Sequence, residues 1–248
     1  MATRRKSPVD IDPIPAHQCS IHLRLEILAN LPFFAELNSD QIQQINSLFT
    51  EKGYEQGEPI FFSGDPASHL YVMADGHVKL MQHTFSGQNV LLDVLVRGEF
   101  FGSLLPQAGD DYSETAIAQT PCCLLGIPNQ AFSNLLQQYP SVSLKVIEKM
   151  SQRLQDANQM IRRLSAQSVE GRMAHILLKL GEKLGQPQEI GLLIQLPLSR
   201  VDLAEMTGTT VETASRVLSR FQKEALIESG RQWVAIRDQP GLQTYQKI

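Results

Sequence analysis

Residues 199–223 read SRVDLAEMTGTTVETASRVLSRFQK, and this stretch decides the fold class of the C-terminal part of the chain. Ser199 and Thr210 are residue types that cap helix N-termini, and Gly208 lies between the two segments that they begin. Two short helices joined by a glycine-containing turn form a helix-turn-helix. We predict the first helix over RVDLAEMTG and the second from Val211 to about Leu226.

The residues around this pair indicate a wing and a third helix. IESGRQWVAIR (residues 227–237) reads as two strands with a turn at Ser229–Gly230. SVEGRMAHILLKLGEKLG, which precedes the pair, reads as a helix that ends at Gly185. Residues 168–248 are therefore expected to form a winged helix-turn-helix domain.

The second helix of the pair begins with polar residues whose chemistry suits DNA. In a helix-turn-helix this helix enters the major groove, and its N-terminal residues contact base edges. Arginine donates to guanine, glutamate accepts from cytosine, and serine pairs with either kind of partner. We expect base contacts from Val211, Glu212, Ser215 and Arg216. The alternative is that Glu212 and Arg216, four residues apart, only pair with each other on the helix surface.

Further residues near this helix are candidates for contacts with DNA phosphates, which position a protein on the duplex. They are Arg200, Thr210, Arg220, Lys223 and Arg231. For the basic side chains the alternative is an ordinary solvated surface position.

Regularly spaced glycines predict a β-roll upstream. Gly76, Gly87, Gly98 and Gly109 recur every eleven residues, and Gly64 lies twelve residues before the first of them. The runs between them, such as HLYVMAD and CCLLGI, are rich in β-branched and aliphatic residues. Short strands with turn glycines are typical of an all-β roll or barrel. We predict the roll over residues 54–128, inside a sensory domain of residues 21–140 with flanking helices. Residues 1–20 read as a flexible arm.

A long helix is predicted over residues 141–167, which contain neither glycine nor proline. Its apolar residues recur at three- and four-residue steps, so the helix is amphipathic with one apolar stripe. We expect the helix to pair in parallel with the same helix of a second copy, as in a short coiled coil. The alternative is a helix packed on its own domain. The expected dimer contacts are Ile147, Met150, Leu154, Ala157, Ile161 and Leu164.

Composition excludes several classes of protein. The chain has 248 residues, 42% of them hydrophobic, and a formal net charge of −4. It holds no run of eighteen apolar residues, so we expect no membrane span. Its three cysteines, Cys19, Cys122 and Cys123, are odd in number, which argues against a disulfide framework and for a reducing cytoplasm. Neither a glycine-rich phosphate loop nor a nucleophile elbow is present, so we do not expect an enzyme.

The ordered set of roll, long helix and winged helix-turn-helix resembles the Crp/Fnr transcription regulators over about residues 21–240. GEPIFFSGDPASHLYVMADGHVKL and RGEFFGSLL resemble the cyclic-nucleotide-binding fold, and VETASRVLSRFQK is similar to the recognition helix of the Fnr branch. The resemblance implies an α+β architecture and a homodimer that binds double-stranded DNA and works with RNA polymerase. It also implies that Glu212, Ser215 and Arg216 read a palindrome of the TTGAT-N4-ATCAA type.

The resemblance places an effector pocket in the roll, with candidate residues Gly102, Ser103, Leu104, Tyr112 and Ser113. Relatives that bind cyclic nucleotides use a glutamate for the ribose and an arginine for the cyclic phosphate. Ser103 and Tyr112 stand at those two positions, and the acid Glu114 follows closely. We therefore predict that the protein does not respond to cyclic AMP, and the effector is left unidentified.

Other sensing chemistries of the family remain as alternatives. The Fnr branch holds an iron–sulfur cluster on four cysteines, and three cysteines are too few for that within one subunit. We expect Cys122 and Cys123 to be strand residues, with a redox role as the less favoured interpretation. Cys19 and His22, with His17 nearby, have spacing that suits a metal or haem, yet two ligands are too few, so we assign no metal. A ligand-binding regulatory module without DNA function is the last alternative, and the helix-turn-helix argues against it.

Overall fold

The computed structural model describes residues 21–84, 89–104, 110–195 and 198–246. The chain divides into two compact units, residues 13–155 and residues 156–248, each described here by itself. The division falls inside the long helix α4, which runs from Pro140 to Ala166. Packing therefore divides the chain within the expected dimer helix and not at either of its ends.

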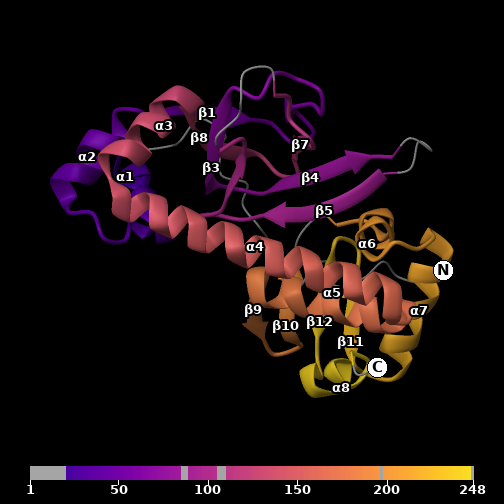
Figure 1. Ribbon diagram of the computed structural model, residues 1–248. Coiled ribbons are helices and arrows are strands. Elements are labelled where there is room, and N and C mark those ends of the chain that lie inside the picture. The colour runs from indigo at the N-terminus through magenta and orange to yellow at the C-terminus, as the bar shows by residue number, and fades with distance from the viewer. Residues whose placement is uncertain (1–20, 85–88, 105–109, 196–197, 247–248) are drawn as a thin grey trace. The chain divides into compact units, whose positions relative to one another are not determined.

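The first unit contains two four-stranded antiparallel sheets (Figure 1). One sheet has the order β1-β8-β3-β6 and the other the order β2-β7-β4-β5. The strands are β1 (Thr50–Tyr54), β2 (Pro59–Phe61), β3 (His69–Asp75), β4 (Val78–His83), β5 (Asn89–Leu95), β6 (Phe100–Gly102), β7 (Thr115–Ala118) and β8 (Cys122–Pro128). The predicted β-roll is confirmed, and it begins at Thr50, four residues before the predicted start.

Turn glycines behave as their spacing predicts wherever the structure describes them. Gly64, Gly76 and Gly98 all have positive φ angles. At Gly76 a Cβ atom would lie 2.4 Å from the Pro121 carbonyl oxygen, so only glycine fits this turn. Gly87 and Gly109 lie outside the described residues.

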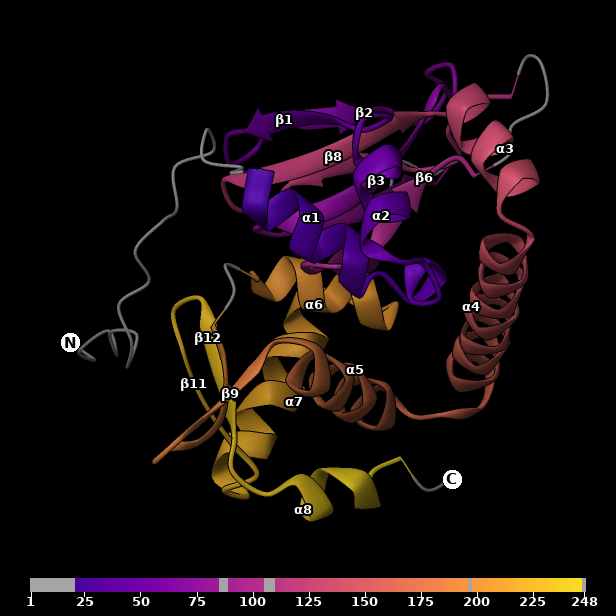
Figure 2. The ribbon, with the colours of Figure 1, turned by 90° about the vertical axis from the view of Figure 1, so that its left-hand side faces the viewer.

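Helices cover one face of the β1-β8-β3-β6 sheet (Figure 2). They are α1 (Ile21–Asn30), the 3-10 turn η1 (Pro32–Phe34), α2 (Ser39–Asn46) and α3 (Asn129–Gln138). Asn38 caps α2 through a reciprocal pair of hydrogen bonds with Gln41, as its residue type predicts. The first residues of α4 also join this helical layer, because Val142 and Val146 are buried in it.

Strand β8 contributes to two separate cores because successive side chains of a strand point to opposite faces. Cys122 and Leu124 face the interior between the two sheets. Cys123, Leu125 and Ile127 face the layer of helices. All five are buried, so β8 forms the boundary between the two cores.

The second unit holds three helices packed with a small sheet of order β11-β12-β10-β9. Its helices are α5 (Val169–Leu184), α6 (Arg200–Thr207), α7 (Val211–Lys223) and the short C-terminal α8 (Gln239–Thr244). Its strands are β9 (Gly185–Gln188), β10 (Gly191–Gln195), β11 (Ile227–Gly230) and β12 (Trp233–Ile236). The winged helix-turn-helix is confirmed, while β9, β10 and α8 were not predicted.

Two predicted boundaries in this unit are wrong. Helix α7 ends at Lys223 and not at Leu226, because Ala225 adopts a left-handed conformation with φ of 56° and turns the chain so that Leu226 is buried. The wing turn falls at Arg231–Gln232 and not at Ser229–Gly230, since Gly230 is the last residue of β11 and pairs with Trp233. A Cβ at Gly230 would lie 2.3 Å from the Trp233 indole nitrogen, so this glycine makes room for the ring.

Candidate nucleic-acid interface

Helices α6 and α7 form a helix-turn-helix whose ends are fixed by local hydrogen bonds. The Ser199 hydroxyl accepts from the backbone of Asp202, and the Asp202 carboxylate accepts in return from the Ser199 backbone. Gly208 ends α6 with φ of 60°, and the Thr210 hydroxyl accepts from the Thr213 backbone to begin α7. The three residues proposed from sequence as caps and turn therefore have those roles.

One side of α7 packs into the domain and leaves the other side exposed. Ala214, Val217, Leu218 and Phe221 are buried. Val211, Glu212, Arg216 and Ser219 are exposed, and Ser215 is half-buried beside them. The predicted base-contacting residues thus share the exposed side at the start of the helix.

The charged groups on this side are held without forming the expected pair. Arg216 donates through Nη2 to the Thr213 hydroxyl over 3.1 Å, and no Glu212–Arg216 ion pair is among the contacts described for these residues. The pKa of Glu212 is lowered by a hydrogen bond from its own backbone N–H, then by the Thr210 hydroxyl, with a smaller effect of the Arg216 charge. Glu212 is therefore an ionised acceptor at neutral pH.

The candidate phosphate residues fall into two groups. Arg200 at the first position of α6, Arg231 in the wing turn and Lys223 at the end of α7 are exposed. Arg220 differs from the expectation, because its guanidinium lies 2.9 Å from Glu224 and 3.6 Å from Glu170. It also lies over the ring of Tyr245, so this side chain is engaged within the domain.

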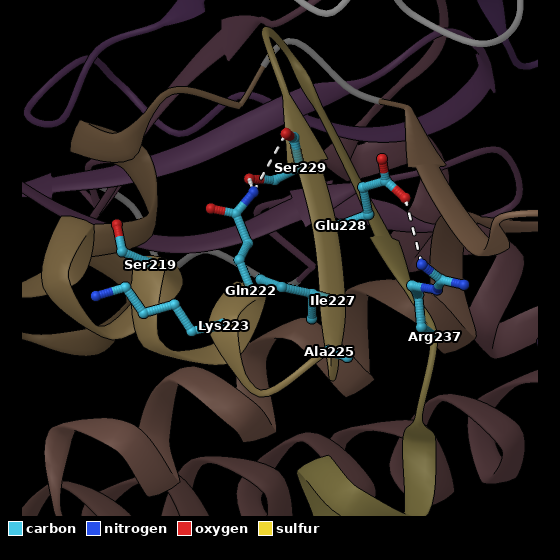
Figure 3. Close-up of a pocket in the computed structure, with 8 residues that line it drawn as sticks. All are labelled: Ser219, Gln222, Lys223, Ala225, Ile227, Glu228, Ser229 and Arg237. Atoms are coloured by element: carbon cyan, nitrogen blue, oxygen red, sulfur yellow. Dashed lines mark hydrogen bonds and ion pairs between the residues drawn. The ribbon is translucent and has the colours of Figure 1, made fainter.

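Two hollows border the exposed side of α7. The first, of about 370 Å³, is lined by Ser215, Arg216, Ser219, Arg220 and Lys223. The second, of about 560 Å³, lies between the end of α7 and strand β11 (Figure 3). In this groove the Gln222 amide donates to the Ser229 hydroxyl over 2.8 Å and so ties the wing to the recognition helix. Glu228 and Arg237 face each other at 3.7 Å on the wing side.

Arg172 of α5 positions the helix-turn-helix and was missed by sequence reasoning. Its Nε donates to the Thr207 carbonyl oxygen over 2.8 Å, and its Nη1 donates to the Gln167 carbonyl oxygen over 2.9 Å. These bonds satisfy carbonyl groups at the ends of α4 and α6, which a helix leaves without intrahelical partners. The position of Arg172 inside a helical pattern gives no sequence signal for this role.

The predicted effector residues of the roll lie around a closely packed aromatic group. The Tyr112 ring is 6% exposed and stacks on Phe61 with ring centroids 3.7 Å apart. Tyr71 and Phe101 also lie beside Phe61. The Tyr112 hydroxyl accepts from the His69 backbone N–H at 3.0 Å and donates to the His69 carbonyl oxygen at 3.1 Å.

The structure brings only some of the effector candidates together. Gly102, with φ of 88°, lies beside the Tyr112 ring, and the Ser103 backbone N–H donates to the carbonyl oxygen of His69. Leu104 packs instead against the helical layer, and the exposed Ser113 hydroxyl donates to Glu114. Gly102, Ser103 and Tyr112 therefore share one site around His69, which Leu104 and Ser113 do not join.

The exposed side of α4 carries an apolar stripe. Ile147, Leu154 and Ile161 lie seven residues apart, and each is more than 60% exposed. Ala157 and Leu164 are exposed on the same helix. Met150 differs from the expectation, because it is half-buried and packs against the layer of helices on the roll.

Arg153 connects α4 with the roll. Its Nη2 donates to the Phe100 carbonyl oxygen, and its guanidinium lies 4.0 Å from the centre of the Phe100 ring. Desolvation lowers the pKa of this side chain, while the charges of Glu99, Asp93 and Glu114 act in the opposite direction. The contact joins β6, next to the predicted effector site, with the helix expected to form the dimer.

The two cysteines of β8 differ in state. Cys122 is a free, buried thiol, and burial, with smaller effects of Asp75 and Glu58, raises its pKa to about 12. A thiol of that kind is unreactive at neutral pH. Cys123 is disulfide-bonded, which corrects the expectation that both cysteines are simple strand residues.

Metal and haem candidates lie mostly beyond the described part of the chain. His17 and Cys19 are outside the described residues, as is the side chain of His22. Among the residues that are described, no group of three or more His, Cys, Asp or Glu side chains could hold a metal ion. No helix within the described ranges is long and apolar enough to cross a membrane.

Comparison with known proteins identifies the family. Residues 51–139 match the cyclic nucleotide-binding domain, and residues 171–245 match the Crp-like helix-turn-helix domain. The chain is 31% identical over 207 residues to the cyclic AMP receptor protein of Thermus thermophilus, covering 84% of this chain and 93% of that protein. It is 33% identical over 221 residues to the probable transcriptional regulator flp of Lacticaseibacillus casei, covering 88% and 93%. The chain therefore belongs to the Crp/Fnr family of transcription regulators.

The structural neighbours and the other relatives agree with this assignment. FixK2 of Bradyrhizobium japonicum superposes with a TM-score of 0.72 at 22% identity, over 81% of this chain and 98% of that one, which supports the fold. The fumarate and nitrate reduction regulatory protein of Vibrio cholerae also matches, at 26% identity over 223 residues. Relatives from both the Crp and the Fnr branches are thus present, and these relatives are regulators and not enzymes. The helix-turn-helix match decides against a regulatory module without DNA function.

Proposed function

We propose that this transcription regulator binds DNA as a homodimer and reads a palindrome of the TTGAT-N4-ATCAA type. The observation that carries the proposal is the exposed side of α7, where Glu212, Ser215 and Arg216 stand free of the domain core. A recognition helix presents its first turns to base edges in the major groove. The buried opposite side fixes the helix, so these side chains are preorganised for contact.

The proposed base contacts follow from the hydrogen-bonding capacity of each group. Arg216 donates two hydrogen bonds to the guanine of the TTGA half-site, and Glu212 accepts from the amino group of the paired cytosine. The lowered pKa of Glu212 supports this role, because an ionised carboxylate only accepts. Ser215 contacts an adjacent base and Val211 packs on a thymine methyl group.

Phosphate contacts are proposed for Arg200, Lys223 and Arg231, with the Thr210 end of α7 beside them. These three cations are exposed around the helix-turn-helix, the end of α7 and the wing turn. We leave Arg220 out of this set, because two carboxylates already hold it. Such contacts add affinity for any sequence and make binding dependent on salt.

The homodimer is proposed to form along α4. Exposed Ile147, Leu154 and Ile161 repeat every seven residues, which is the spacing of a left-handed coiled coil. Exposed isolated apolar residues are ordinary, but a continuous stripe of them along one helix marks an interaction surface. A two-fold pair would place two recognition helices on half-sites about one helical turn apart.

The signal is proposed to be something other than cyclic AMP. The packed ring of Tyr112 supports this, because it stands where the resemblance would place an arginine for the cyclic phosphate. Glu114 adds a negative charge close by. An anionic ligand would meet both an aromatic filling and a carboxylate at that point.

Any signal received by the roll is proposed to reach DNA through α4. Arg153 supports this route, since it holds α4 to the backbone of β6 beside the effector residues. A ligand shifts such an equilibrium only by binding the two arrangements with different affinity. Changed pairing of α4 would then alter the spacing of the recognition helices. RNA polymerase is the further partner that we propose for the protein, and the cytoplasm its location.

The proposal is tested by fluorescence anisotropy with purified full-length protein. The protein is titrated onto a labelled TTGAT-N4-ATCAA duplex and onto a scrambled duplex of the same composition, both at 0.15 M salt. We expect tighter binding to the palindrome by at least roughly a hundredfold, in the range of specific over nonspecific recognition. Equal affinity for the two duplexes would contradict the proposed operator, and a selection from random DNA would then identify the true one.

A further inference from the structure

The disulfide at Cys123 has only one possible partner within this chain. The sequence contains three cysteines, and Cys122 is free. Cys123 is disulfide-bonded, so by count its partner is Cys19, whose position lies outside the described residues. We propose that Cys19 and Cys123 form a reversible thiol–disulfide pair, an oxidative modification site that links the N-terminal arm covalently to the roll.

The alternation of strand β8 selects Cys123 and not its neighbour for this bond. Cys122 faces the interior between the two sheets, where it is surrounded by residues of both. Cys123 faces the layer of helices, in the same cluster as Ile27 and Leu28 of α1. Adjacent cysteines on one strand thus meet different surroundings, and only one of them faces the helix that follows Cys19 in the chain.

Contacts at the start of α1 bring this part of the chain close to Cys123. Arg24 donates to the carbonyl oxygen of Phe49 over 2.9 Å and forms an ion pair with Glu51 of β1 at 3.1 Å. Gly53, two residues further along β1, is the register partner of Cys123 on β8. The beginning of α1 is therefore fixed to the strand that lies next to Cys123.

Chain length allows Cys19 to reach the bonding distance. Leu23 packs against the cluster that contains Cys123, and Cys19 precedes it by four residues. Four residues span at most about 14 Å, and a disulfide requires Cα atoms about 4.4–6.8 Å apart. No rearrangement of α1 is needed for the bond.

The proposed oxidation is a two-electron exchange with a low-molecular-weight disulfide. The Cys19 and Cys123 thiols are oxidised to one protein disulfide, and the external disulfide is reduced to two thiols, which take up the two protons. A thiolate in excess reverses the reaction through a mixed disulfide. Cys122, buried and free on the other face of the strand, takes no part.

The bond is tested first by mass mapping of the full-length protein, without reference to DNA. Protein treated with an oxidised low-molecular-weight disulfide is alkylated while unfolded, digested and mapped, with a dithiol-reduced sample alongside. We expect Cys19 and Cys123 in one cross-linked peptide, only Cys122 alkylated before reduction, and all three alkylated afterwards. Three alkylated thiols in the oxidised sample, a bond that includes Cys122, or a disulfide between two copies on a non-reducing gel would each overturn the proposal.

A second test asks whether the bond regulates DNA binding, a consequence that rests on the proposed function. Anisotropy with the palindromic duplex compares oxidised and reduced forms of the wild type, of Cys19→Ser and of the matched control Cys122→Ser. We expect the dissociation constant to change at least threefold on reduction in the wild type and in Cys122→Ser, and to stay constant in Cys19→Ser. Equal affinities for both forms of the wild type would overturn regulation by this bond. Absence of specific binding in every form would instead contradict the proposed function and leave the mapped bond standing.

Discussion

Arg216 is the residue on which the proposed base reading chiefly depends. Its guanidinium is exposed and makes one described hydrogen bond, to the Thr213 hydroxyl. We predict that Arg216→Ala weakens binding to the palindrome by about 1–3 kcal/mol and relaxes the preference for guanine at one position. Anisotropy with duplexes substituted at that position measures both effects.

A matched variant separates base reading from charge. Lys223→Gln removes one exposed cation from the end of the same helix and should weaken all duplexes alike, with a smaller dependence on salt. If Arg216→Ala also weakened all duplexes equally, the guanine contact would be excluded.

His175 of α5 gives a pH dependence that is independent of DNA. Burial, followed by the charges of Arg163 and Lys179, lowers its pKa to about 4. The unfolded chain would bind a proton near pH 6.5, so the folded state loses stability as pH falls from about 6.5 towards 4. We predict a loss of about 1–3 kcal/mol in the free energy of unfolding across this window, allowing for partial solvent screening.

Urea unfolding at several pH values checks this prediction. His175→Gln should flatten the dependence between pH 6.5 and 4, while the exposed His83→Gln should leave it unchanged. An equally steep slope in His175→Gln would assign the acid sensitivity to other groups.

At the scale of the element, α4 presents the surface on which the dimer depends. Ile161 is 61% exposed in the middle of the apolar stripe. We predict that Ile161→Glu weakens the dimer by at least roughly tenfold, because a charge would be buried in the interface without a partner. Analytical ultracentrifugation measures the effect directly.

The control for this variant lies on the same helix. Gln159 is exposed two residues before Ile161, and the stripe passes it on the other side of the helix. Gln159→Glu adds the same charge and should leave the dimer intact. A dimer unaffected by Ile161→Glu would place the interface elsewhere.

Elements differed in how well the sequence predicted them. The caps at Asn38, Ser199 and Thr210 were identified from residue type, because capping depends on local hydrogen bonds. The end of α7 was not, because the left-handed Ala225 follows from the burial of Leu226, a tertiary demand. The wing turn was misplaced for a similar reason, since Gly230 serves the Trp233 ring and not the turn.

The candidate site was predictable where helix periodicity alone orders the residues. Glu212, Ser215 and Arg216 share one side of α7 because of their spacing. Arg172, Arg153 and the bonded state of Cys123 were missed, since each depends on a contact between segments distant in sequence. Arg220 was misassigned because an ion pair with Glu170 of another helix cannot be read from a charge count.

At the scale of the whole molecule, the absence of a response to cyclic AMP is the most informative expectation. The family model for residues 51–139 is that of a cyclic nucleotide-binding domain, while Tyr112 fills the centre of the roll. We predict no heat of binding for cyclic AMP up to millimolar concentrations and no change in DNA affinity. Isothermal titration calorimetry measures the first and anisotropy the second.

A positive control makes the negative result meaningful. The Thermus thermophilus relative, named a cyclic AMP receptor protein, can be titrated under identical conditions. Micromolar binding by the present protein would show that the aromatic group rearranges to admit the nucleotide.

The short helix α8 has a practical consequence for anyone who shortens this protein. Its Tyr245 donates a hydrogen bond to Glu224, its ring packs edge-on against Phe221 of the recognition helix, and Gly171 of α5 lies directly against its backbone. A truncation before Gln239 would keep every predicted DNA-contacting side chain and yet strip the cover from the rear of the helix that carries them. The smallest autonomous DNA-binding fragment must therefore extend through Gln246, beyond the last strand of the wing.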